Sequence, residues 1–559
     1  MGVTGVVRKT RARVRERGAP THVATLALRP TPVQRSNADK RLDAGRRVFN
    51  AVLGECFRRR NAMVTDPAYL TARSLPVGKT GAGSTIEQRA VKKARTEAFK
   101  AVQDAHGFTE SAVMSFASSL RVAWVREHVG AQQAQALGRQ AFRAVADWHY
   151  RGKGKPRFKS VRRGMRSMTT KDTLGNMRPV LTGGVIIAVR WGTDVIAVHS
   201  PSGNSRKARE TRAELERVSA AVANGGLLST RIVRTPVKGT TTLRAHLTLD
   251  GHPPVRHERG TGRVRLDVGP QVLAWTTFEQ DSPAGVPHLS LLADGIENIQ
   301  ARLRREQRRL DRQHRAGSPD CFHPDGTHIR NGCHWGRSVR KSGHATATQV
   351  RVADLHARVT GHRKTLHGQL ANQILTHGVD VATEKIAYTS WVKTFPRSMR
   401  DRAPGGFIDR LRRKAESADG GTFYEFSTYT TALSQTCVCG ARQRKPLWQR
   451  VHRCQCGITA HRDVFSSFLA DHVHPDNGVD RLDLVGAAQA VGLLHDIEDA
   501  RGPAFTTKRR GRGPASRRSM ARIKARRKAK AAKRQSRSSA GTTHPTPTAT
   551  PATHGVETA

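Results

Sequence analysis

Two closely spaced cysteine pairs constrain the fold of this 559-residue chain more than any other feature. The pairs are Cys437/Cys439 and Cys454/Cys456, and a glycine follows each of them. Two paired-cysteine turns about fifteen residues apart are a common way to build a small zinc ribbon. The alternative is four reduced cysteines without a metal. Because both the spacing and the glycine repeat, the pattern favours zinc.

The charge of the chain indicates what kind of partner it binds. Lys and Arg number 97 against 44 Asp and Glu, and the formal net charge is +53. Such an excess over a long chain implies a polyanionic partner, most simply nucleic acid. A membrane surface is the weaker alternative, since no apolar run approaches the roughly 20 residues that span a bilayer.

The N-terminus and the cysteine count indicate the compartment. The first residues are basic but contain no apolar segment of the secretory type, so we expect a protein that is not secreted. The expected location is cytoplasmic, nucleoid-associated and prokaryotic-type. The chain has seven cysteines. This odd number favours a reducing compartment with free or metal-bound thiols over a disulfide framework.

Hydrophobic periodicity predicts helices and strands in turn along the chain. The expected strands are 21–32, 178–199, 229–250, 263–278 and 379–386. The expected helices are 36–60, 88–150, 206–222, 296–313, 350–376 and 407–418. A long polar loop is expected over 316–348. After about residue 502 the chain is first strongly basic and then rich in Pro and Thr, which predicts disorder.

Three acidic residues occupy positions that suit a metal-dependent nuclease. Asp267 follows an apolar strand in VRLDVG, Glu384 ends one in VDVATE, and Asp463 stands at an expected helix start in HRDVFSSF. A two-metal nuclease needs carboxylates from different elements around ions roughly 4 Å apart. Each acid has an ordinary alternative: a turn aspartate, an edge-strand glutamate facing water, and an aspartate that stabilises a helix dipole. Their order, with the cysteine pairs before the third acid, favours the nuclease.

Two basic segments are candidates for nucleic-acid contacts. Lys155, Arg157 and Lys159 surround Phe158, as suits a phosphate backbone with a stacked base. A second group lies on the expected helix 296–313, and its members are Arg304, Arg305 and Arg308. The alternative in both cases is a solvated basic surface.

The motifs together resemble the TnpB family, the transposon-encoded RNA-guided nucleases related to compact type V CRISPR effectors. The resemblance covers roughly residues 21–470 and rests on LDVG, VATEKI, RAPGGFIDRLRRKAES, LSQTC, KPLWQRVHRC and HRDVFSSFL, with GKPRFKS and LRPTPVQ in addition. The chain departs from the family in one respect. Both cysteine turns read C-x-C where the family usually has C-x-x-C, and Gly440 and Gly457 are the residues that would let the shorter turns close.

The resemblance implies a multidomain protein: α/β, with a β-barrel, a helical lobe and an RNase H-like (RuvC-type) nuclease domain carrying an inserted zinc-ribbon-like module. The expected parts are a basic disordered arm (1–20), a split wedge-like β-barrel (21–34 and 160–258), a helical recognition lobe (35–159), the nuclease domain (259–470) with its ribbon (433–460), a helical extension (471–504) and a disordered basic and Pro/Thr-rich tail (505–559).

The resemblance also implies an activity, an RNA-guided DNA endonuclease that a transposon encodes. Guide RNA and target DNA are then the partners. Two catalytic Mg²⁺ ions would be held by Asp267, Glu384 and Asp463, and one structural Zn²⁺ by Cys437, Cys439, Cys454 and Cys456. Two other functions stay open: a nuclease-silent RNA-guided DNA-binding protein, and a transposase or recombinase that uses the same RNase H-like fold.

Overall fold

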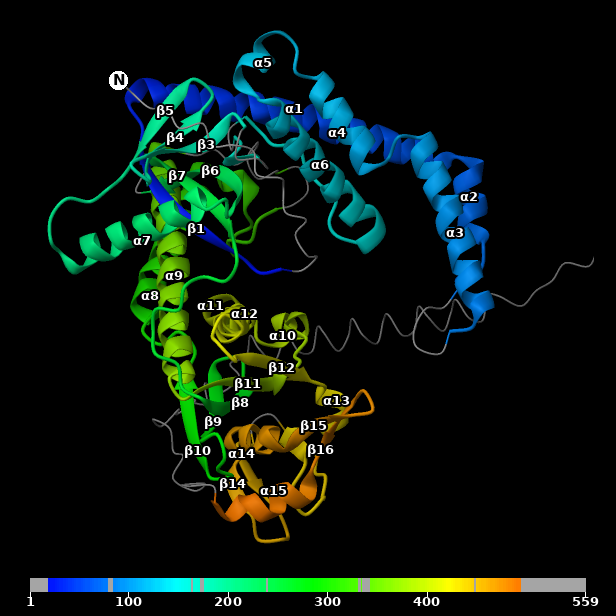
Figure 1. Ribbon diagram of the computed structural model, residues 1–559, viewed down its shortest axis with the longest axis vertical. Coiled ribbons are helices and arrows are strands. Elements are labelled where there is room, and N and C mark those ends of the chain that lie inside the picture. Colours follow the sequence, from blue (N-terminus) through cyan, green and yellow to red (C-terminus); the bar gives the residue numbers. More distant parts are fainter. Residues whose placement is uncertain are drawn as a thin grey trace, which may run out of the picture. The chain divides into compact units, whose positions relative to one another are not determined.

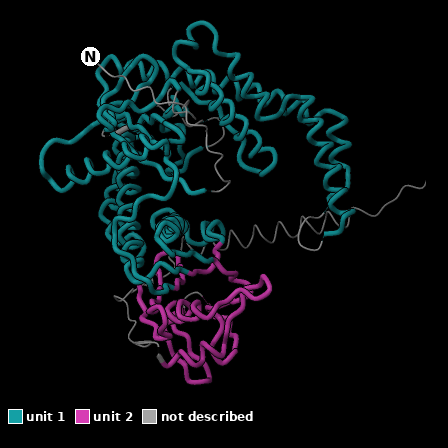
Figure 2. The backbone as a smooth tube through the Cα atoms, viewed as in Figure 1, with its two compact units in different colours: residues 1–264, 291–381, 387–424 teal, residues 265–290, 382–386, 425–559 magenta. Residues whose placement is uncertain are grey.

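The computed structural model describes residues 19–78, 84–161, 164–170, 175–237, 240–329, 333, 342–446 and 449–493. Nearly all of the expected arm 1–20 and the whole tail 505–559 therefore lie outside the described residues. The chain divides into two compact units (Figure 2). Unit 1 comprises residues 1–264, 291–381 and 387–424, and unit 2 comprises 265–290, 382–386 and 425–559.

A seven-stranded sheet in unit 1 joins the first strand of the chain to much later ones (Figure 1). Its strands are β1 (Thr21–Arg29), β2 (Ser167–Thr170), β3 (Met177–Thr182), β4 (Val185–Trp191), β5 (Asp194–Val198), β6 (Leu227–Val237) and β7 (Thr240–Asp250). Their order is β2-β6-β7-β1-β5-β4-β3. Strand β1 pairs with β7 and with β5, and its alternate residues Ala24, Leu26 and Leu28 are buried. The strands expected over 178–199 and 229–250 are confirmed.

Among the described residues of unit 1, seven helices lie between these strands in the sequence. They are α1 (Pro32–Thr65), α2 (Pro67–Ser74), α3 (Ile86–Ala105), α4 (Glu110–Ser119), α5 (Ala123–His128), α6 (Ala131–Arg151) and α7 (Arg206–Ala223). Helix α1 is longer than expected because Thr31 caps it and forms a capping box with Gln34. The helix expected over 206–222 is confirmed by α7.

The stretch expected to be helical over 88–150 is helical but not continuous, because turns divide it into α3, α4, α5 and α6. Gly107 has a φ of +59°, which ends α3 in the left-handed region. Thr109 then caps α4 through its side chain, and Gly130 precedes α6. Turn and cap residues thus outweigh a nearly continuous apolar pattern.

The remaining helices of unit 1 are α8 (Glu297–Gly317), α9 (Gly343–Leu375), α10 (Tyr388–Thr394), α11 (Pro396–Arg402) and α12 (Pro404–Ala415), with a short 3₁₀ turn at Pro319–Cys321. Helices α8 and α9 pack through Leu303, Leu355 and Val359. The loop expected to reach residue 348 is shorter, because Ser342 caps α9 at Gly343. No helix in the described part of the chain has the length and apolar character to cross a membrane.

A second sheet has five strands in the order β10-β9-β8-β11-β12 (Figure 1). Their bounds are β8 (Gly262–Val268), β9 (Val272–Phe278), β10 (Gly285–Leu291), β11 (Gly378–Glu384) and β12 (Thr422–Phe426). The first strand in sequence, β8, is thus the middle strand. The strands expected over 263–278 and 379–386 are confirmed.

The rest of unit 2 consists of short elements. They are α13 (Thr428–Thr431), β13 (Val451–Arg453), β14 (Thr459–His461), α14 (Arg462–Leu469), β15 (Val473–Asp476), β16 (Val479–Leu482) and α15 (Leu484–Ala490), with 3₁₀ turns at Leu433–Gln435, Ala470–His472 and Val491–Leu493. The helical extension expected over 471–504 is wrong in its first part, which is the hairpin β15–β16. Asn477 (φ +49°) and Gly478 (φ +80°) form its turn, as Asn-Gly does in two-residue hairpins.

Candidate metal centres

Asp267 and Glu384 lie on neighbouring strands of the second sheet. Asp267 is the last residue but one of β8, and Glu384 is the last residue of β11. Thr383, just before Glu384, donates a hydrogen bond from its hydroxyl to the carbonyl of Leu266, just before Asp267, at 3.3 Å. Asp267 and Glu384 therefore lie next to each other at the ends of two strands of this sheet.

Asp463 lies in the first turn of α14. Two buried contacts fix this helix within unit 2. The hydroxyls of Thr276 on β9 and Ser467 on α14 are 2.7 Å apart. Just after α14, Asp471 forms a buried ion pair with Arg265 of β8 at 2.8 Å. The third acid is thus held beside the strands that carry the first.

The three acids, which we name the carboxylate group, share an electrostatic environment. Burial raises the pKa of Asp267 well above its usual range, and the negative charges of Asp463 and Glu384 act in the same direction. Burial also raises the pKa of Glu384 to about 7. Arg462 and a hydrogen bond from Ser466 act to lower the pKa of Asp267 but do not outweigh these effects. The donor set, three carboxylates with a deficit of positive charge, therefore suits a divalent cation.

Each carboxylate oxygen of Asp463 accepts a hydrogen bond from an arginine. Arg450 donates to Oδ2 at 2.8 Å and Arg462 donates to Oδ1 at 3.0 Å. Neither arginine was predicted as a site residue. In the sequence Arg462 directly precedes Asp463, and Arg450 stands in the motif KPLWQRVHRC, but neither position indicated a contact with Asp463.

The four paired cysteines, which we name the cysteine cluster, converge in unit 2. Their sulfurs all lie within 4.8 Å of one another, and among the described residues this is the only group of metal-ligating side chains so close together. Cys437 and Cys456 have sulfurs 3.6 Å apart, and the sulfurs of Cys439 and Cys454 are 3.5 Å apart. Four thiolates on one Zn²⁺ at about 2.3 Å each require separations of roughly 3.8 Å. The separations within the cluster are therefore compatible with four thiolates on one zinc ion.

The shortened C-x-C turns close in the same way in both halves of the cluster. The amide of Cys437 donates to the carbonyl of Ala441 at 3.0 Å, and the amide of Cys454 donates to that of Ile458 at 3.0 Å. The glycine after each pair has a positive φ, +83° at Gly440 and +94° at Gly457. Since only glycine adopts this conformation without strain, the two glycines allow the one-residue spacing.

A buried lysine lies beside the cysteine cluster. The ammonium of Lys445 is 2.7 Å from Nδ1 of His452 and donates to the carbonyl of Ser434 at 3.3 Å. Burial lowers the pKa of Lys445, while Cys437 and Cys454 act to raise it. The sequence interpretation missed Lys445, although its charge can offset that of a zinc bound by four thiolates.

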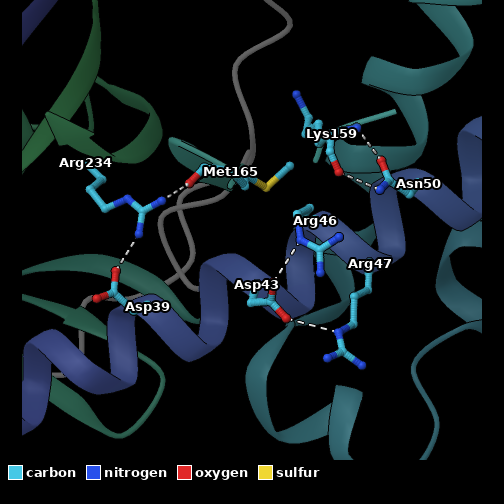
Figure 3. Close-up of polar contacts among 8 residues, drawn as sticks. All are labelled: Asp39, Asp43, Arg46, Arg47, Asn50, Lys159, Met165 and Arg234. Carbon is cyan, nitrogen blue, oxygen red and sulfur yellow. Dashed lines mark hydrogen bonds and ion pairs between the residues drawn. The ribbon is translucent and has the colours of Figure 1, made fainter. Parts of the chain in front are cut away.

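The basic turn at 155–159 lies on α1, and part of its charge is engaged there. The side chain of Asn50 holds the backbone of Lys159 by two hydrogen bonds, at 2.8 and 2.9 Å (Figure 3). The ammonium of Lys159 lies 4.3 Å from the ring centre of Phe49, and that of Lys155 lies 5.3 Å from the ring centre of Phe57. Lys155, Arg157 and Phe158 are exposed, and Lys159 is half-buried. The first three are therefore the members of this group most available to a nucleic acid.

Arg234 links the chain just after this turn to the same helix, α1, through hydrogen bonds. Arg234 of β6 donates to Asp39 of α1 at 2.7 Å and to the carbonyl of Met165 at 3.3 Å (Figure 3). Nearby on α1, Asp43 pairs with Arg46 and Arg47 (Figure 3).

On α8, the three predicted arginines are all exposed: Arg304, Arg305 and Arg308.

The loop after α8 contains a disulfide, between Cys321 and Cys333. The expectation of free or metal-bound thiols is therefore wrong for this pair. It holds for the other five cysteines, which carry no disulfide. The bridge is local: backbone hydrogen bonds from Cys321 to Ser318 and from Ile329 to Cys321 fold the loop back on itself.

Comparisons with known proteins give weak matches only. No protein-family model matches the chain, and neither does any curated protein. Among solved structures, the chain is similar to a Cas12f1-sgRNA-target DNA complex, with 11% identity, a TM-score of 0.42, and coverage of 80% of this chain and 98% of that one. A CRISPR-Cas12f ternary complex matches with 10% identity, a TM-score of 0.25 and the same coverage. A Cas12i-crRNA-dsDNA complex matches with 8% identity, a TM-score of 0.25, and coverage of 68% and 57%. At these values the similarities assign no function to this chain.

Proposed function

We propose that the chain is a metal-dependent DNA endonuclease with a single RuvC-type site formed by Asp267, Glu384 and Asp463. The observation that carries this proposal is the placement of the three acids, two at the ends of neighbouring strands and one in the first turn of a helix packed on the same sheet. All three belong to unit 2. The strand order supports an RNase H-like domain, because the first strand is the middle one and carries the first acid. The expected part 259–470 is proposed on the same basis.

The chemistry proposed is hydrolysis of a phosphodiester bond. Two Mg²⁺ ions would be held by the carboxylate group, and they supply activation of a water and stabilisation of the leaving oxygen. The residues of the chain have two tasks. Asp267 and Glu384 supply negative charge at the ends of neighbouring strands. Arg462, which precedes Asp463 on α14, orients the Asp463 carboxylate through a hydrogen bond. The products are a terminal phosphate and a free hydroxyl.

We further propose that a guide RNA directs this activity to target DNA. The support is the resemblance of the motifs to the TnpB family, together with the net charge of +53. In such a complex, base pairing reads the sequence while the protein holds the hybrid through its backbone. The candidate contacts are Lys155, Arg157, Phe158 and Lys159 of the basic turn, and the exposed arginines of α8. Origin in a transposon belongs to the same proposal, as do the split barrel 21–34 plus 160–258 and the recognition lobe 35–159.

The alternatives are a nuclease-silent binder and a recombinase. The protein, purified with its bound RNA, is incubated with Mg²⁺ and a plasmid library that contains sequences matching that RNA. We expect cleavage that requires both the matching sequence and the metal. Binding without cleavage would favour the silent binder, and joined DNA ends would favour the recombinase. Cleavage that persists after the RNA is digested would contradict guidance by RNA.

A further inference from the structure

We propose that Arg450 is a displaceable counter-ion of the carboxylate group, which weakens divalent-cation binding until a nucleic-acid phosphate draws it away. This inference rests on the proposed nuclease function. Its basis is the arginine pair on Asp463. Because Oδ2 accepts from Arg450 and Oδ1 accepts from Arg462, a cation at Asp463 has to compete with a guanidinium charge at either oxygen.

The two arginines differ in how firmly they are held. The side chain of Arg462 is 10% exposed, and it donates a further hydrogen bond to the carbonyl of Pro446 at 3.4 Å. The side chain of Arg450 is 55% exposed. Ion pairs of such exposed side chains contribute little to folding stability and break readily. Arg450 is therefore the partner that a cation can displace, while Arg462 remains to orient Asp463.

The hairpin β13–β14 fixes the position of Arg450. Arg450 directly precedes β13, and its carbonyl accepts a hydrogen bond from the amide of Arg462 at 2.7 Å. At the next level of the hairpin, Val451 pairs with His461. The two arginines thus stand side by side at the open end of a hairpin whose closed end is the turn of Cys454 and Cys456.

Packing against α14 holds the hairpin in this position. The ring of His452 lies 4.6 Å from that of Phe465, between centroids, and both residues are buried. Phe465 lies on the same helix as Asp463. The backbone of Arg450 is therefore rigid relative to Asp463, while its side chain is free to turn toward solvent. That combination suits a guanidinium that moves between two anions.

The chemistry of arginine supplies the second anion. A guanidinium binds phosphate oxygens through paired hydrogen bonds, as it binds carboxylates. A DNA or RNA phosphate that approaches the carboxylate group offers Arg450 a new partner. Oδ2 of Asp463 would then be available to a divalent cation without competition from Arg450. Metal binding and nucleic-acid binding are then coupled, and each strengthens the other.

The test measures Mn²⁺ binding to the full-length protein freed of RNA, by the loss of the free-ion electron paramagnetic resonance signal. The Asp463→Ala variant defines the component that belongs to the carboxylate group. For Arg450→Ala we expect Mn²⁺ binding about threefold to tenfold tighter than in the wild type. Arg450→Lys, which keeps the charge, should stay close to the wild type.

Arg453→Ala is the matched control, because Arg453 is an exposed arginine three residues along on β13 and its loss changes the net charge equally. It should leave Mn²⁺ affinity unchanged. A short single-stranded DNA with non-hydrolysable linkages should tighten Mn²⁺ binding to the wild type and have a smaller effect on Arg450→Ala. Melting temperature and zinc content of each variant report whether the hairpin is intact.

The outcomes separate the two proposals. If Mn²⁺ binds in an Asp463-dependent way but with equal affinity in the wild type and Arg450→Ala, the counter-ion role is overturned and the metal site stands. An equal gain for Arg453→Ala would also overturn it, since a general charge effect would suffice. If no variant shows Mn²⁺ binding that depends on Asp463, the proposed metal site itself fails, and the role of Arg450 fails with it.

Discussion

The carboxylate group and the cysteine cluster are two candidate metal centres in one unit, and they are assembled in opposite ways. The cysteines come from two short turns that use the same backbone hydrogen bonds and the same left-handed glycine. The acids come from β8, β11 and α14, which are far apart in the sequence and meet only through a sheet and a packed helix. The first centre depends on local turns, and the second depends on the whole fold of the unit.

The two centres also differ in how their charge is balanced. Beside the cysteines, Lys445 is buried and fixed by His452 and Ser434. Beside the acids, Arg450 is largely exposed, and burial keeps the pKa of Asp267 and Glu384 high. A fixed cation suits a structural metal that stays bound. An incompletely balanced group of acids suits ions that bind together with the substrate.

The largest expected effect is on catalysis. Asp267→Ala should lower Mg²⁺-dependent cleavage at least about a thousandfold, because a lost ligand carboxylate misplaces the ions. Affinity for nucleic acid should change little, since it depends mainly on phosphate contacts. Single-turnover cleavage and filter binding measure the two quantities.

Glu384→Ala and Asp463→Ala should behave like Asp267→Ala, and a double variant should be no worse than a single one, because the acids act as a unit. Full cleavage by any of the three variants would remove that residue from the site. The carboxylate group would then be an ordinary cluster of buried acids, and it could no longer be compared with the cysteine cluster as a second metal centre.

The next largest effect concerns the cysteine cluster. Replacing Cys439 and Cys456 by Ser should reduce the zinc content from about one per chain to none and unfold the hairpin β13–β14, at a cost on the order of 5 kcal/mol or more. Metal analysis and thermal unfolding measure this. The matched control replaces Cys321 and Cys333, and it should keep its zinc. Zinc that disappears with the control pair instead would contradict the assignment of the ligands.

A third, smaller effect is the pH dependence of stability in the absence of divalent ions. The pKa of Glu384 is raised from 4.5 to about 7, so the folded state holds this proton more tightly than the unfolded state. The contribution of this proton to the free energy of unfolding is complete below about pH 4.5. It falls as the pH rises toward 7 and is lost above about pH 7. The loss of folding free energy should be on the order of 3 kcal/mol, from about 2.5 pKa units.

Glu384→Gln should flatten this pH dependence, since its side chain carries no proton to lose, and Mg²⁺ should restore the stability of the wild type above pH 7. Urea unfolding across the pH range, compared between the wild type and Glu384→Gln, isolates the effect from that of other groups. A wild-type curve that rises between pH 5 and 7 relative to the variant would contradict a raised pKa.

The sequence predicted the local features of both centres. The cysteine turns, the strand ends at Asp267 and Glu384, and the first helical turn at Asp463 all depend on neighbours within a few residues, and each is confirmed as a local structure. Local signals were overlooked in one place: Asn477–Gly478 is a strong hairpin signal, and residues 473–482 form a hairpin rather than a helix.

Contacts that depend on pairing register could not be predicted. Arg450 reaches Asp463 only because Val451 pairs with His461, and Lys445 reaches the cysteine cluster only because the chain between the two turns folds back. The same limit applies to the basic turn. The spacing of its residues did not indicate that Lys155 and Lys159 also lie over aromatic rings that helix α1 supplies. Periodicity and spacing carry no information on such long-range partners.

The smallest expected effect tests the fixed cation beside the cysteines. Lys445→Met should lower zinc affinity about tenfold, because a bound zinc with four thiolates keeps a negative charge that the ammonium offsets. Chelator competition measures this, with Arg444→Met as the control, since Arg444 is an exposed neighbour with the same charge. Mn²⁺ binding to the carboxylate group should not change in either variant. Zinc affinity that is unchanged or tighter in Lys445→Met would show that the buried lysine is held only by His452 and Ser434, and the contrast in charge balance between the two centres would then be lost.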